Sequence, residues 1–160
     1  MHGDSGWVGP LHTALGFLCL ALGTAVVSVR KGTRQHRRLG LSYAAAMLGL
    51  NATALSIYRV FGGFGPFHVL ALISLATLCA GILPALRRRP GWLERHARLM
   101  SWSYVGLLAA TAAEAATRLP VVRSGTAFGV AALLSSLAVV AVGAAVIYRR
   151  VPRIVASQQR

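Results

Sequence analysis

Four histidines stand at matching places beside apolar stretches, and they are the side chains best suited to hold a cofactor. His12 and His68 each precede an apolar run, whereas His36 and His96 each follow one in a basic segment. A neutral imidazole nitrogen can bind haem iron axially, or it can coordinate zinc, copper or non-haem iron. One histidine at a membrane interface is ordinary, but four in symmetric pairs favour a shared role. The pattern therefore predicts one cofactor between His12 and His68, the first histidine of each half of the chain, and another between His36 and His96, the second histidine of each half.

Glu114 is the second informative residue, because it is the only acid inside an apolar run. It follows His96 by roughly 27 Å along a helix, which brings it to the level predicted for the first histidines. Arg118 lies four residues later on the same helical face, so the two can form an ion pair. Alternatively, Glu114 joins His12 and His68 in a His₂Glu metal site of the kind that binds zinc. Both readings stay open from the sequence.

Arginines flank the second histidine of each half. By default they set the membrane topology and contact lipid headgroups. Beside a haem, they would also pair with its propionates. These residues are Arg37, Arg38, Arg95 and Arg98. Two other polar residues, Asn51 and Thr53, lie inside an apolar run and are expected to form hydrogen bonds between helices.

The composition indicates which elements carry these side chains. Of the 160 residues, 56% are hydrophobic and only 12% are charged, whereas a soluble domain has about a quarter charged residues. The net charge of +14 comes from basic residues in short segments between apolar runs. This distribution is typical of a membrane protein and argues against nucleic-acid binding. Both cysteines, Cys19 and Cys79, fall in apolar runs and are expected to be small hydrophobic residues.

The apolar runs predict five transmembrane helices in an all-α, multi-pass bundle that forms one transmembrane domain over residues 1–160. With five crossings, the basic segments RKGTRQHRR, RRRPGWLERHAR and RRVPR all fall on one side. The positive-inside rule makes that side cytoplasmic, with the N-terminus outside and the C-terminus inside. The expected helices cover residues 7–29, 39–60, 67–86, 97–119 and 128–148.

The matching histidine pattern also predicts an internal repeat. Helices one and two look like a copy of helices three and four in the same orientation, which implies a pseudo-two-fold axis along the membrane normal. The fifth helix has no counterpart in this scheme. The prediction is therefore a tandem-repeated four-helix bundle with one peripheral helix, in contact with the lipid bilayer.

Four segments carry a resemblance to a known family, namely LHTALG, KGTRQHRRLG, FHVLALISL and ERHARLMSWSYVGLLAATAAEAATRLP. The chain resembles an uncharacterised family of bacterial predicted membrane proteins, a domain of unknown function, over roughly residues 10 to 120. The resemblance implies a multi-pass protein of the bacterial inner (cell) membrane and no particular activity.

The layout is also distantly similar to the two-haem transmembrane b-type cytochromes that reduce ferric iron or oxidised ascorbate. In that family alternate helices share a haem, which corresponds here to His12 with His68 and to His36 with His96. The resemblance implies haem b, transmembrane electron transfer and a respiratory or redox partner protein. The departure is depth, because the second histidines lie in or beside basic loops.

Three hypotheses follow for the function. The first is a cytochrome-like electron carrier that binds haem through the paired histidines. The second is a metal-binding enzyme or carrier that uses His12, His68 and Glu114. The third is a non-catalytic accessory or assembly subunit of a respiratory membrane complex, in which the histidines only shape an interface.

Overall fold

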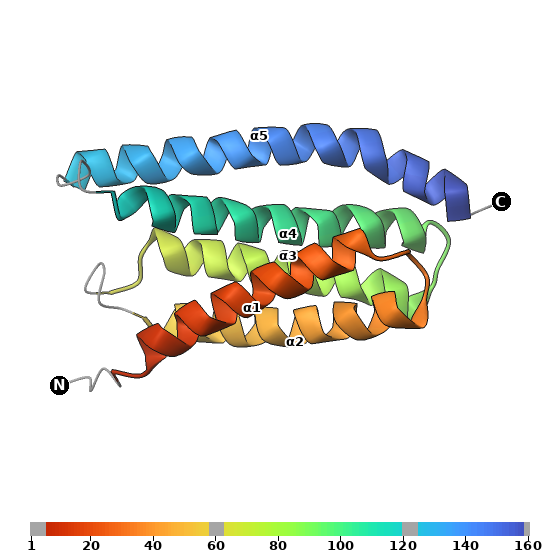
Figure 1. Ribbon diagram of the computed structural model, residues 1–160, viewed down its shortest axis with the longest axis horizontal. Helices are drawn as coiled ribbons and strands as arrows, with labels where there is room; N and C mark the ends of the chain where they lie inside the picture. The colour runs from red at the N-terminus through yellow and green to blue at the C-terminus, as the bar shows by residue number, and fades with distance from the viewer. Residues whose placement is uncertain (1–5, 58–62, 120–124, 159–160) are drawn as a thin grey trace. The chain divides into compact units, whose positions relative to one another are not determined.

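The computed structural model describes residues 6–57, 63–119 and 125–158, and this part of the chain consists of five α-helices with no strand (Figure 1). The prediction of an all-helical protein is therefore confirmed. The helices are α1 (Val8–Ser28), α2 (Arg34–Ser56), α3 (Pro66–Arg87), α4 (Trp92–Thr117) and α5 (Gly125–Gln158).

Four of the described helices, α1, α2, α3 and α5, are long and apolar enough to cross a membrane. Helix α4, expected to be the fourth span, has the length but is not among these four helices. Its first two turns hold three charged residues, and a carboxylate follows near its other end. These residues are Glu94, Arg95, Arg98 and Glu114.

Three helices extend well beyond the apolar runs that predicted them, whereas α3 exceeds its run by one residue at each end. Helix α2 already begins at Arg34, where the Thr33 hydroxyl oxygen accepts the backbone N–H of His36 at 3.1 Å and caps the helix. Helix α4 begins at Trp92, and α5 continues to Gln158. As a result, His36 and His96 lie inside helices and not in the connecting loops. The predicted residues 58–60 of the second span lie outside the described part.

Contacts divide the chain into two compact units, Met1–Ala76 and Thr77–Arg160. The boundary falls inside α3. The first unit contains α1, α2 and the first half of α3, and the second contains the rest of α3 with α4 and α5.

In the first unit, α1 and α2 pack against each other as an antiparallel pair (Figure 1). The connection is fixed by Lys31, whose ammonium donates to the carbonyl oxygens of Val26, Val27 and Val29 at 2.8, 2.8 and 3.3 Å. A cation at this position satisfies carbonyl groups that the helix leaves without donors. Burial lowers the pKa of Lys31.

In the second unit, α5 runs antiparallel along α4 (Figure 1). Val105 of α4 forms a buried cluster with Ile147 and Val151 of α5. At Gly143 the two backbones come so close that an added Cβ would lie 2.6 Å from both methyl carbons of Val105. Only glycine fits at that position without a displacement of α5.

Candidate functional site

His12 is half-buried in the second turn of α1, and its Nδ1 lies 2.9 Å from the Oγ1 of Thr53 in α2. The Thr53 hydroxyl directs its single proton to the backbone of its own helix, with Oγ1 2.8 Å from the Leu50 carbonyl oxygen and 3.1 Å from that of Gly49. It therefore accepts from the His12 Nδ1–H, and the neutral imidazole keeps its lone pair on Nε2. Histidines that bind metals have the same arrangement: one ring nitrogen binds the metal, and the other donates its N–H to an oxygen of the protein. The predicted interhelical bond of Thr53 is thus present.

Asn51 differs from its expected role. Its Nδ2 donates to the Met47 carbonyl oxygen at 2.8 Å, which is a contact within α2.

His96 repeats the arrangement of His12 in the second unit. Its Nδ1 lies 2.8 Å from the carbonyl oxygen of Gly81 in α3. A carbonyl oxygen can only accept, so Nδ1 carries the proton and Nε2 carries the lone pair of the neutral ring. The Trp92 ring lies one turn earlier, with its centroid 6.4 Å from that of the imidazole.

The His96 contact stands where α3 and α4 approach closely. A Cβ added at Gly81 would lie 2.8 Å from the Met100 sulfur and 3.2 Å from the Met100 backbone nitrogen. Pro84, inside α3, has no N–H to give to the carbonyl of Ala80, one residue before Gly81. The imidazole thus ties α4 to α3 beside an interruption in the hydrogen bonding of α3.

His68 has the opposite protonation pattern. It is 2% exposed, its Nδ1 accepts the backbone N–H of Gly65 at 3.1 Å, and its ring stacks on Phe64 with a centroid separation of 5.1 Å. The neutral ring then carries its proton on Nε2. His68 is the third residue of α3 and reaches back to the residue before the helix, as the Glu or Gln of a capping box does.

Both predicted histidine pairs stay predictions. His12 and His68 both lie in the first unit, but their hydrogen bonds place the lone pair on different ring nitrogens. His36 is half-buried at the third position of α2 and belongs to the first unit, whereas His96 belongs to the second. The pairing of His36 with His96 stays a prediction.

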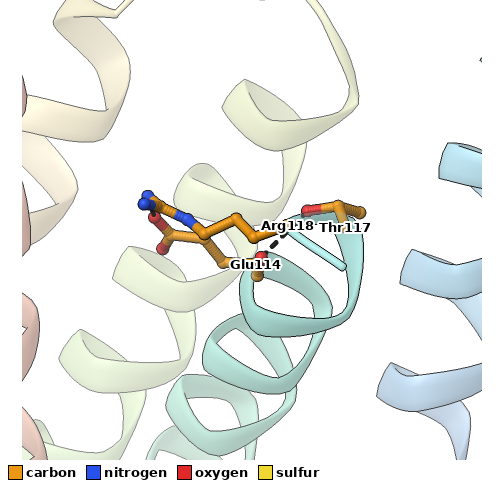
Figure 2. A network of polar contacts seen from close by, with 3 residues as sticks. All are labelled: Glu114, Thr117 and Arg118. Carbon is orange, nitrogen blue, oxygen red and sulfur yellow. Dashed lines mark hydrogen bonds and ion pairs between the residues drawn. The ribbon is translucent and has the colours of Figure 1, made fainter. Parts of the chain in front are cut away.

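Glu114 forms the ion pair expected from its spacing. Figure 2 shows its carboxylate accepting from the guanidinium of Arg118, while the Thr117 hydroxyl donates to the Glu114 carbonyl oxygen at 3.0 Å. Within the described ranges, no three His, Cys, Asp or Glu side chains gather to hold a metal ion. A site made of His12, His68 and Glu114 would combine both units and stays a prediction.

The arginines beside the second histidines differ in their contacts. Arg95 donates to the Pro90 carbonyl oxygen at 3.1 Å, and Arg98 pairs with Glu94. Around Arg37, the first turns of α2 form a shallow cavity of about 310 Å³, lined by Arg34, Arg37, Arg38 and Leu41. This cavity was not predicted from the sequence, because the second helix was expected to begin only at residue 39, after Arg38. A helix begun at Arg34 would have placed these residues on one face.

Comparison with known proteins identifies one matching family. A family model described as a predicted membrane protein, DUF2306, matches residues 9–155. No curated protein and no solved structure matches the chain.

Proposed function

The chain belongs to the DUF2306 family of predicted membrane proteins. We propose that this membrane protein binds haem, is cytochrome-like and acts in transmembrane electron transfer. The observation that supports this proposal is the state of two imidazoles. His12 and His96 each give their Nδ1–H to a fixed oxygen and carry the lone pair on Nε2. In that form His12 and His96 could each bind a haem iron through Nε2.

The four histidines do not fit the cofactor equally well. His12 and His96 fit as ligands, and Thr53 and the Gly81 carbonyl would orient their rings and raise their basicity. His68 does not fit as it stands. If its Nε2 bound iron, either Nδ1 would have to release the Gly65 N–H or the imidazole ring would have no proton on either nitrogen. A bound haem supplies one-electron oxidation and reduction.

The positions of the two fitting histidines suit a path across the membrane. His12 lies at the start of α1 and His96 at the start of α4. With the predicted five crossings, the starts of the first and fourth helices lie on opposite faces. Two redox centres on opposite sides are what transmembrane electron transfer needs.

The test is the optical spectrum of the full chain, purified in detergent after expression with added haem. We expect a Soret band in the wild-type protein, its loss by about half in His12→Ala and in His96→Ala, and no change in His68→Gln. Thr111→Val, which removes only a hydroxyl bonded within α4, is the matched control for damage to the bundle. A wild-type protein with no Soret band would overturn the proposal.

A second candidate is a non-catalytic accessory or assembly subunit, favoured by the capping bond of His68. In that role, His12 and His96 join helices and bind nothing. A protein that lacks the Soret band and co-purifies with a larger respiratory complex would support this second function.

A further inference from the structure

The described part of the chain has very few carboxylates for its many cations. It contains Glu94 and Glu114, which pair with Arg98 and Arg118. Asp4, the third acid of the sequence, lies outside the described residues. With 17 lysines and arginines in the chain, most cationic side chains need counter-ions from outside the protein.

One group of arginines lies so close together that its need for a counter-ion is greatest. Arg34, Arg37 and Arg38 follow the i, i+3, i+4 spacing, so their guanidinium groups share one face of the first turns of α2. They line the shallow cavity of about 310 Å³ together with Leu41. Like charges at this spacing repel each other, and the positive end of the helix dipole adds to the potential. An anion in the cavity would relieve both effects.

The corresponding turns of α4 show that such arginines can be satisfied from within the chain. Their cavity, of about 490 Å³, has Glu94 in its wall, paired with Arg98. Arg95 in the same wall donates to Pro90. No carboxylate stands in the wall of the α2 cavity, so its charge is not balanced in this way.

We propose that the α2 cavity binds the phosphate of an anionic phospholipid headgroup. Guanidinium groups bind phosphate through paired hydrogen bonds and are weakly hydrated, which suits a membrane surface. The fourth wall residue, Leu41, is 67% exposed and lies where α2 continues into its apolar stretch. A phospholipid has the matching order, because its phosphate would meet the arginines and its hydrocarbon chains would lie deeper, beside Leu41. The proposal is independent of haem, because it uses none of the histidines.

The test is native mass spectrometry of the full chain in detergent, with phosphatidylglycerol added at a series of concentrations. We expect one retained phosphatidylglycerol per chain. Each arginine near an anionic surface contributes about a fivefold gain in affinity, so the variant R34Q/R37Q/R38Q should bind on the order of 100-fold more weakly. The variant R149Q/R150Q/R153Q removes equal charge from α5 and should weaken binding by less than about fivefold.

Two further arms identify the source of the phosphate. Phosphatidylcholine, with the same phosphate and no net charge, should bind at least tenfold more weakly than phosphatidylglycerol. Inorganic phosphate should not displace the lipid at millimolar concentration. Equal losses in the two triple variants, equal binding of the two lipids, or displacement by inorganic phosphate would each overturn the proposal.

Discussion

At the scale of single residues, the position of a ring proton separates the histidines. The sequence placed four histidines at helix ends and paired them by symmetry. It could not show that Thr53 and Gly81 would accept from His12 and His96, since these acceptors lie on other helices. The role of His68 had a local signal, because Gly-Pro followed by a polar side chain at the third helical position is a cap pattern.

The capping role of His68 predicts different effects for two substitutions. His68→Gln keeps a side-chain acceptor at the third helical position and should leave the unfolding free energy nearly unchanged. His68→Ala should lower it by about 1 kcal/mol through loss of the cap, with a further loss from the buried ring. Thermal unfolding of the full chain in detergent, followed by circular dichroism, measures both. Equal destabilisation by the two substitutions would show that the Gly65 bond contributes nothing.

At the scale of helices, the apolar runs located every described helix but missed the charged ends of α2, α4 and α5. An apolar run records the part of a helix that suits lipid, whereas the backbone hydrogen bonds continue through charged residues where a cap permits. Thr33 provides such a cap ahead of the arginines of α2. The close approach of α4 and α5 could not be predicted either, because it depends on Gly143 facing Val105 across two helices.

This contact predicts a contrast between two glycines of α5. Gly143→Ala would force its methyl group into Val105 and should destabilise the protein by about 1–3 kcal/mol. Gly129→Ala is the matched control, since nothing lies within 4 Å of its added Cβ. It should be neutral or stabilise the helix by up to about 1 kcal/mol. Unfolding in increasing denaturant compares the two, and similar midpoints would contradict the contact.

At the scale of the whole molecule, the fold class followed from composition. A chain this poor in charge and rich in apolar runs has to satisfy its backbone groups within helices, so an all-helical membrane protein was predictable. Helix α4 is not among the four described helices that are long and apolar enough to cross a membrane. The predicted orientation depends on a crossing by this helix.

The prediction of five crossings places the two ends of the chain on opposite sides. In a variant with Cys19 and Cys79 replaced by alanine, a membrane-impermeant maleimide should label Gly6→Cys in intact spheroplasts. Ser157→Cys should react only after permeabilisation. Labelling of both cysteines in intact spheroplasts would mean that the number of crossings is even.

The length of α5 has a consequence for whatever meets the protein at the membrane surface. Its 34 residues span about 51 Å, and even at a tilt of about 40° it rises about 39 Å, more than the roughly 30 Å hydrocarbon layer. Val151, near the far end, is only 2% exposed and is held in the cluster with α4. We therefore expect the excess length to lie in water at the basic end of α5, where Pro152 removes one backbone hydrogen bond and the cluster with α4 holds Val151 in place. A partner docking there would meet arginines on a helix that is already formed.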